Sequence, residues 1–308
     1  MEQRRIGGLT VSLAGLGTNN FGRRLDAAET RKVVEAALDA GVTHFDTADI
    51  YGEGRSEEYL GRALGPRRDD VTIASKFGYH GPPRGARGQE EWVPQALEAS
   101  LRRLGTDRLD LFYYHKPDPG TPLLETLRVM NDLVERGLVR EIGCSNFTAA
   151  QLEEADRAAR EHGLRGFAVV ENEYSLMERA PEEDGVLAAV RAHGMALVPF
   201  FPLASGLLSG AYRRGRPTPH GSRLGDGRPA EQLLSSAHLD VVERLAEYAE
   251  ARGHTLLELS LSYLPAHAPV ATVIAGATSE VQVRANAAAS GAWTLTHEEL
   301  DEVVALLG

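Results

Sequence analysis

The sequence is poor in cysteine and lysine, and it lacks any long apolar run. Its single cysteine, Cys144, excludes an intramolecular disulfide and fits a reducing compartment, so a cytoplasmic location is expected. No apolar stretch reaches the roughly 18 residues of a membrane-spanning helix. No apolar segment follows the basic residues of MEQRRIGGLT, so no signal peptide is expected either.

Positive charge is scarce as well. The formal net charge of −11 disfavours non-specific binding to nucleic acid. Lysine occurs only at positions 32, 76 and 116, so a lysine in a buried position calls for a physical reason. The length of 308 residues is large for an ordinary domain but normal for one α/β barrel.

Short apolar runs alternate with helical patterns along most of the chain. Most of these runs are continuously apolar, which is typical of strands covered on both faces. The expected strands are Ser12–Gly17, Val42–Asp46, Val71–Lys76, Leu109–His115, Val139–Ser145, Phe167–Glu171, Ala196–Phe200 and Val270–Ala275.

Helix start signals fall between these runs. Capping-box pairs are expected at Asp26 and Glu29, Thr148 and Gln151, and Thr296 and Glu299. Ser56 is expected to cap a helix over 57–64, and Pro94 to open the next one. Two further helices, about 237–252 and 256–266, are expected before the last strand.

A strand followed by a helix, repeated eight times, predicts a (β/α)₈ TIM barrel that is α/β in class. The whole chain, residues 1–308, is expected to form this single domain, interrupted by a long loop at about 205–236. Active sites of such barrels lie at the C-terminal ends of the strands. The polar residues expected there are Asp46, Tyr51, Lys76, His115, Ser145, Asn146 and Glu171.

Four of these residues suit proton transfer to a carbonyl oxygen. A phenol has a reference pKa near ~10, and a nearby ammonium lowers it. Asp46 would hold Lys76 charged beside Tyr51, and His115 would orient a substrate oxygen. Each residue alone also fits a structural role, such as a turn cap or a core histidine.

The sequence resembles the aldo-keto reductases over nearly its whole length. The fragments GLGTNNFG, DTADIYGEGRSEEYLG, SKF, YYHKPD, IGCSNF, ENEYSL, PFFPLASGLLSG and IAGATSEVQVRAN occur in that family's order. The resemblance implies an NADPH-dependent carbonyl reductase that works without a metal. It also implies a catalytic tetrad of Asp46, Tyr51, Lys76 and His115, with Tyr51 as the proton donor.

The same resemblance implies the residues that bind the NADP cofactor. The segment near the nicotinamide ribose is Gly17, Thr18 and Asn19, with Asp46. Ser145, Asn146 and Glu171 would meet the carboxamide, and Phe200 would stack on the nicotinamide ring. The pyrophosphate loop would include Pro202, Leu203, Ser205, Gly206, Leu208 and Gly210. The adenosine end would include Gly276, Thr278, Ser279, Gln282, Arg284 and Asn286.

Two departures from the family pattern affect the cofactor site. Glu171 stands where a glutamine is usual; a carboxylate can still accept a hydrogen bond from the carboxamide, but it adds negative charge. Gly276 and Gln282 stand where many relatives carry basic residues, which leaves Arg284 as the expected cation for a 2′-phosphate. We therefore expect a modest preference for NADPH, with NADH also possible.

The long loop is rich in arginine. In its part 211–228, Arg213, Arg214, Arg216, Arg223 and Arg228 stand against one acid, Asp226, and fit either a clamp on the cofactor phosphates or a solvated loop. Elsewhere, Cys144 is expected in the core. The expected candidates for the wall of the substrate pocket are Phe21, Tyr79 and Trp92.

Two other functions remain open on the sequence. The first is a slow or non-catalytic, cofactor-sensing relative of potassium channel β subunits, which resemble the same family. The second is a metal-dependent lyase or isomerase in which Asp46, His115 and Glu171 bind a divalent ion, although this leaves Tyr51 and Lys76 without a role. The expected partner is a small carbonyl substrate, which could be an aldehyde, a ketone or a sugar-derived compound.

Overall fold

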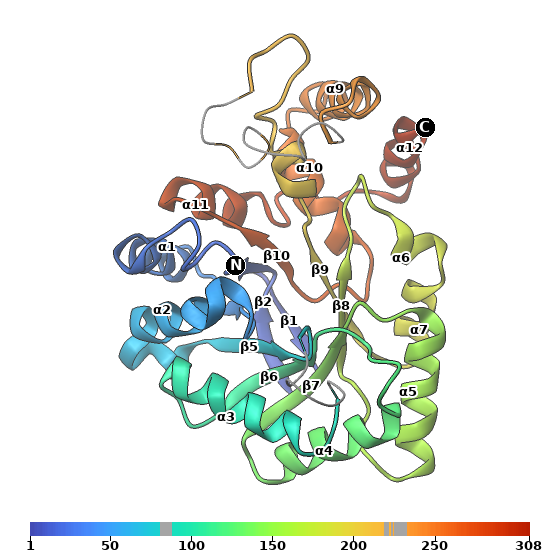
Figure 1. Cartoon of the computed structure of the whole chain (residues 1–308). Coiled ribbons are helices and arrows are strands. Elements are labelled where there is room, and N and C mark those ends of the chain that lie inside the picture. Colours follow the sequence, from blue (N-terminus) through green and yellow to red (C-terminus); the bar gives the residue numbers. More distant parts are fainter. Residues whose placement is uncertain (81–87, 219–221, 223, 225–232) are drawn as a thin grey trace.

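The structure is a computed structural model that describes residues 1–80, 88–218, 222, 224 and 233–308. Within these residues, eight parallel strands close into a barrel that helices surround (Figure 1). The predicted (β/α)₈ barrel is therefore confirmed. The barrel strands are β3 (Ala14–Gly17), β4 (His44–Asp46), β5 (Thr72–Phe77), β6 (Leu109–Tyr114), β7 (Val139–Ser145), β8 (Val169–Glu173), β9 (Ala196–Phe200) and β10 (Val273–Gly276).

The register of the strands brings their C-terminal ends to one level. Gly17 at the end of β3 pairs with Asp46 on one side and with Gly276 on the other. Ser145 at the end of β7 pairs with Glu171 in β8. Because all these strands are parallel, their last residues share one mouth of the barrel.

An antiparallel hairpin precedes the barrel and was not predicted. Its strands are β1 (Gln3–Ile6) and β2 (Leu9–Ser12), so Ser12 belongs to the hairpin and not to the first barrel strand. Ile6, Leu9 and Val11 pack with barrel-interior residues, which closes the N-terminal end of the barrel. The signal for this hairpin was the Gly7-Gly8 pair between two short runs.

The last barrel strand also begins later than predicted. Val270 makes only an isolated bridge to Leu197, and β10 begins at Val273, which pairs with Ala14. The predicted apolar run therefore includes the loop that leads into the strand.

The helices follow the predicted order, and their starts are well explained by capping. Asp26, Thr148 and Thr296 form the predicted capping boxes, and Thr255 forms another. The helices are α1 (Ala27–Asp39), α2 (Arg55–Leu64), α3 (Trp92–Leu104), α4 (Leu123–Glu135), α5 (Ala149–Glu161), α6 (Ala180–Glu183), α7 (Val186–Ala192), α9 (Ser236–Glu250), α10 (Leu256–Tyr263), α11 (Glu280–Ala289) and α12 (His297–Leu307).

Two predicted helix starts were wrong. Gly54 precedes α2, and the predicted cap Ser56 is a buried residue inside the helix. The helix that Pro94 was expected to open begins two residues earlier, at Trp92.

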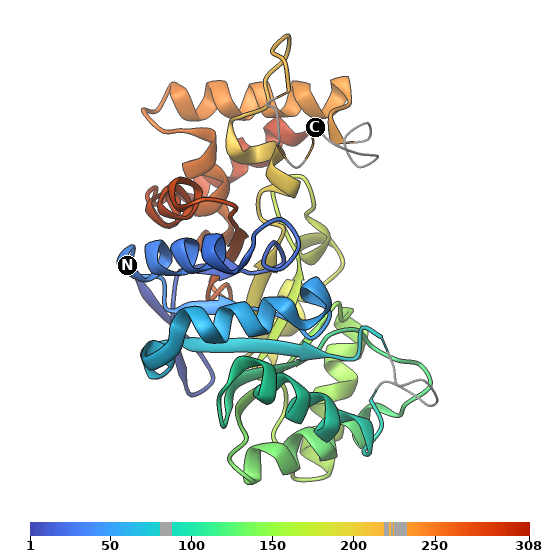
Figure 2. The ribbon, with the colours of Figure 1, turned by 60° about the vertical axis from the view of Figure 1, so that its left-hand side comes forward.

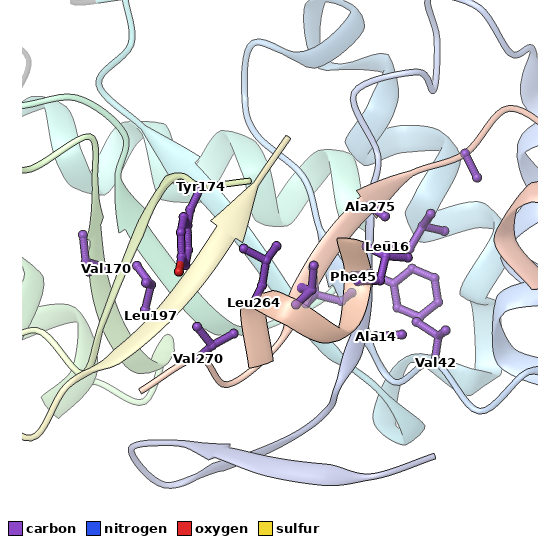
Figure 3. Close-up of a cluster of buried hydrophobic side chains, with 14 of the residues drawn as sticks. Ala14, Leu16, Val42, Phe45, Val170, Tyr174, Leu197, Leu264, Val270 and Ala275 are labelled. Carbon is purple, nitrogen blue, oxygen red and sulfur yellow. The ribbon is translucent and has the colours of Figure 1, made fainter. Parts of the chain in front are cut away.

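The main core lies between the barrel and the helices. Figure 3 shows part of it, with Leu16, Phe45 and Val42 gathered beside the strands. Cys144 is fully buried in the same core, as expected. The α9 helix lies at one end of the molecule, where it contacts α12 (Figure 2). No helix in the described residues is long and apolar enough to cross a membrane.

Candidate active site

The mouth of the barrel contains a cavity of about 440 Å³. It lies where the strands end, so side chains far apart in the sequence meet in it. The predicted site residues that line this cavity are Gly17, Thr18, Asn19, Asp46, Tyr51, Tyr79, His115, Ser145, Asn146, Glu171, Phe200 and Gly276. Arg23, Ile50 and Phe201 also line it and were missed by the sequence analysis.

Lys76 lies at the floor of the site and is 0% exposed. Its ammonium donates a hydrogen bond to Asp46 Oδ1 and another, of 3.1 Å, to the Thr47 carbonyl oxygen. Glu171 Oε2 lies 3.3 Å from the same nitrogen. The buried lysine is therefore explained by two carboxyl groups that surround it.

Tyr51 is placed by a tight turn between β4 and α2. Gly52 in this turn has φ of 58°, and a Cβ there would lie 2.8 Å from the Phe21 carbonyl oxygen. Ser56, at the start of the helix after the turn, is tied to the strand ends. Its hydroxyl donates to the Thr18 carbonyl oxygen at 3.0 Å and lies 2.9 Å from Thr47 Oγ1. These contacts hold the turn that presents Tyr51.

The catalytic candidates lie close together in the cavity. The Lys76 ammonium is 5.4 Å from the centroid of the Tyr51 ring. The rings of Tyr51 and His115 are 6.3 Å apart in an edge-to-face arrangement. The structure thus brings together Asp46, Tyr51, Lys76 and His115, which the sequence grouped by their positions at strand ends.

Burial sets the protonation states of these groups. Burial raises the pKa of Tyr51, against the lowering effect of Lys76, so the phenol keeps its proton at neutral pH. Burial and the Lys76 charge lower the pKa of His115 to about 3, so the imidazole is neutral. Burial alone would lower the pKa of Lys76, but the nearby Asp46 and Glu171 have the larger combined effect, so the Lys76 pKa is raised.

Two carboxyl groups share the single ammonium, and burial raises the pKa of both Asp46 and Glu171. Burial and the nearby Asp46 raise the pKa of Glu171 well above its usual range, and Lys76 opposes them only in part. Asp46 holds the direct hydrogen bond to Lys76, so we assign the negative charge to Asp46 and the proton to Glu171. The floor of the site is then neutral overall.

Ser145 and Asn146 lie at the end of β7. Asn146 has φ of 61°, a left-handed conformation that asparagine tolerates better than most residues. Its amide nitrogen donates to the His115 carbonyl oxygen and to Ser145 Oγ, both at 3.0 Å. Asn146 is therefore fixed beside the catalytic candidates.

A second cleft, of about 330 Å³, adjoins the first, and Phe201 and Gly276 line both. Its other lining residues from the predicted cofactor set are Pro202, Leu203, Ser205, Gly206, Thr278, Gln282 and Asn286. Leu208, Gly210 and Ser279 are not among the described lining residues. Leu208 is buried, Gly210 ends a 3₁₀ turn, and Ser279 caps α11.

The structure does not place Arg284 in this second cleft. Its guanidinium lies 3.1 Å from Asp39 on α1, and Arg284 is not among the residues that line the cleft. Among the described residues that line the cleft, the cation is Arg24, which the sequence analysis missed. The available signal was its position in the NNFGRR segment, directly after the first barrel strand.

The arginines of the long loop are placed only in part. Arg213 pairs with Glu243 at 2.9 Å and with Glu250 at 3.0 Å, and Arg214 pairs with Asp240. These acids belong to α9, so the first two arginines bind that helix and not the two clefts. Arg223 and Arg228 of the proposed clamp lie outside the described residues.

Of the three aromatic candidates for the pocket wall, Tyr79 lines the cavity, with its ring 5.0 Å from that of His115. Phe21 is fully buried in the core, and Trp92 packs against the core at the start of α3. The structure therefore supports a place in the wall for Tyr79 and a packing role for the other two.

Known proteins with related sequences span most of this chain. A probable voltage-gated potassium channel subunit beta from Arabidopsis thaliana is 35% identical over 296 residues, covering 93% of this chain and 90% of the relative. The L-glyceraldehyde 3-phosphate reductase of Escherichia coli strain K12 is 30% identical over 319 residues, covering 98% of this chain and 91% of the relative.

A solved structure shares the same fold. The glycerol dehydrogenase of Gluconobacter oxydans is 27% identical to this chain, with a TM-score of 0.85, and the match covers 99% of this chain and 94% of that one. The aldo/keto reductase family model matches residues 14–307, which includes the whole barrel and every catalytic candidate described above. We conclude that the chain belongs to the aldo/keto reductase family.

Proposed function

We propose that the protein is an NADP(H)-dependent oxidoreductase that reduces an aldehyde or ketone to an alcohol. The observation that carries this proposal is a half-buried, protonated Tyr51 whose ring lies 5.4 Å from the Lys76 ammonium at the cavity. A neutral phenol can donate a proton, and an adjacent cation stabilises the phenolate that remains.

The residues around the cavity fit a nicotinamide cofactor. In the described residues, Asp46 Oδ2 is buried without a hydrogen-bond partner, and Glu171 Oε2 has only its ion-pair contact with Lys76; ribose hydroxyls and a carboxamide offer donors to such atoms. Ser145 and Asn146 supply further polar groups, and Phe200 supplies an apolar face. When bound, the cofactor supplies a hydride to the carbonyl carbon.

The protein's own residues would handle the proton and the oxygen. As the carbonyl carbon is reduced, Tyr51 gives its hydroxyl proton to the carbonyl oxygen, and the alcohol forms. Lys76, held by Asp46, stabilises the resulting phenolate. The neutral His115 imidazole orients the carbonyl oxygen beside Tyr51 by hydrogen bonding.

We also propose a preference for NADPH, which Arg24 supports in place of Arg284. Arg24 lines the second cleft together with Gln282 and Asn286 at the predicted adenosine end. A guanidinium there suits a phosphate group through charge-assisted hydrogen bonds.

A direct assay tests the function. The purified protein should reduce 4-nitrobenzaldehyde with NADPH at a steady rate, followed by the loss of nicotinamide absorbance. If the reaction stops after a single turnover, the result would favour a second candidate function, a slow cofactor-binding protein. The similarity to a potassium channel subunit beta is the reason for considering this function.

The metal-dependent alternative is disfavoured by the contents of the site. The Lys76 ammonium occupies the position between Asp46 and Glu171 that a divalent cation would need. A cation in that place would meet strong repulsion from a fixed positive charge.

A further inference from the structure

Two consecutive arginines at the barrel mouth face two different clefts. Arg23 lines the cavity that contains Tyr51, and Arg24 lines the second cleft. Asn20 anchors the loop that carries them, since its carbonyl oxygen accepts from the backbone nitrogens of Arg23 at 3.2 Å and Arg24 at 2.9 Å. Its side chain also donates to the Ala277 carbonyl oxygen at 3.2 Å.

This loop is further held by its apolar residues. Phe21 is fully buried, and Leu25 is buried beside it. The loop also lies against the turn that presents Tyr51, because Gly22 closely approaches Gly52. The backbone of Arg23 is therefore fixed next to the catalytic tyrosine.

The Arg23 guanidinium is exposed, and no hydrogen bond or ion pair holds it among the described residues. The acids that line the same cavity are already engaged, since Asp46 and Glu171 surround Lys76. Glu53, in the turn that follows Tyr51, lies 3.4 Å from Arg55. The positive charge of Arg23 is thus available to a molecule in the cavity.

A second cation lies beside Tyr79, a residue of the cavity wall. The Lys116 ammonium is 6.0 Å from the centroid of the Tyr79 ring, and Tyr79 is 42% exposed at the cavity wall. In a chain of net charge −11, two cations at one mouth make this region locally attractive to anions.

We propose that Arg23 binds an anionic group, a carboxylate or a phosphate, carried by the carbonyl substrate. The planar guanidinium matches both groups with paired hydrogen bonds. Arg23 and Tyr51 line one cavity of about 440 Å³, which the nicotinamide end of the proposed cofactor would share, so a small substrate held at Tyr51 lies in the cavity that Arg23 lines. The assignment rests on the proposed carbonyl reduction and names its substrate class.

A matched pair of substrates tests the carboxylate arm. Wild-type enzyme should reduce 4-carboxybenzaldehyde with kcat/KM about tenfold above that for methyl 4-formylbenzoate, its neutral ester. Arg23→Gln should remove this preference mainly by raising KM for the acid, because the contact is equal in ground and transition states. Arg23→Lys should retain part of it.

Binding of a phosphate group is tested by comparing kcat/KM for glycolaldehyde phosphate with that for glycolaldehyde in the same variants. Arg62→Gln serves as the control for loss of one positive charge, since Arg62 lies on the exposed surface of α2, in an ion pair with Glu58. Added salt should weaken the preference in wild type and have little effect in Arg23→Gln.

The outcomes separate the two proposals. Equal efficiency for charged and neutral substrates in wild type, or a preference that survives Arg23→Gln, would overturn the anion subsite while leaving carbonyl reduction intact. Failure of wild type to reduce any of the four compounds would overturn the proposed function and the subsite with it.

Discussion

At the scale of single residues, the site depends on a lysine with no exposure to solvent. Lys76 contacts Asp46, Thr47 and Glu171 within one barrel layer. A compact ammonium fits among these groups, whereas a planar guanidinium is wider and needs a different set of partners. The size of the cation is therefore as important as its charge.

Lys76→Arg should accordingly lower kcat by about 10²-fold or more, because the displaced neighbours no longer support Tyr51. The matched control is Lys32→Arg, at an exposed position on α1, which should leave the rate unchanged. Circular dichroism would confirm that both variants fold. A near-normal kcat for Lys76→Arg would mean that the ammonium has no part in the reaction.

Glu171 illustrates how burial changes the meaning of a residue. The sequence suggested an added negative charge at this position, but burial and the nearby Asp46 raise the pKa of Glu171, so we assign it a proton beside Lys76. A neutral carboxyl closely resembles the glutamine that is usual in the family.

Glu171→Gln should therefore keep kcat within about threefold of wild type, which steady-state kinetics with NADPH would measure. Because the folded pKa of Glu171 is raised, its proton stabilises the fold fully below the usual pKa of 4.5 and less as pH rises through the folded pKa. The Tm of wild type should then fall relative to Glu171→Gln as pH increases. A parallel pH dependence in both proteins would argue that Glu171 is ionised.

At the scale of secondary-structure elements, the turn between β4 and α2 carries the tyrosine. Gly52 has φ of 58° and no room for a Cβ next to the Phe21 carbonyl oxygen. Gly105 at the end of α3 has a similar φ of 65°, with nothing within 4 Å of a Cβ. Replacing either glycine by alanine strains the backbone, but only the change at Gly52 also causes a clash, so comparing the two variants separates these effects.

Gly52→Ala should lower both Tm and kcat, since the turn must move away from the loop that carries Phe21. Gly105→Ala should cost only about 1 kcal/mol of stability, from the left-handed backbone alone, with kcat unchanged. Thermal unfolding and kinetics of the two variants check this. Equal effects on kcat would show that the position of the turn does not matter for catalysis.

The sequence predicted the barrel strands well because buried parallel strands are continuously apolar, as in Leu109–Tyr114. It also placed Asp46, Lys76 and His115 together, because strand ends converge by geometry. The hairpin at Gln3–Ser12 was missed because two short strands give a weak pattern. The position of the Arg284 guanidinium was not predictable, because it depends on Asp39, a partner from a distant helix.

At the scale of the whole molecule, two adjoining clefts correspond to the two expected roles, carbonyl reduction and binding of the adenosine end of the cofactor. The first contains the catalytic candidates, and the second contains Gln282, Asn286 and Arg24 at the expected adenosine end. The loop after β3 contributes Arg23 to the first cleft and Arg24 to the second, so one short segment lines both.

Arg24→Ala should weaken NADPH binding about tenfold and leave NADH binding almost unchanged, since only NADPH carries the 2′-phosphate. Isothermal titration calorimetry would measure both dissociation constants. Arg284→Ala is the control, because that guanidinium pairs with Asp39 and should affect neither cofactor by more than about twofold. Equal losses for both cofactors in Arg24→Ala would contradict a contact with the 2′-phosphate.

The most direct test of the whole account is the Tyr51→Phe variant, assayed for reduction of 4-nitrobenzaldehyde and for NADPH binding in parallel. The account predicts a loss of kcat of about 10²–10⁴-fold with an unchanged NADPH dissociation constant, because the ring remains and only the proton donor is removed. A rate within a factor of about three of wild type would contradict it, since Tyr51 would then not be the acid.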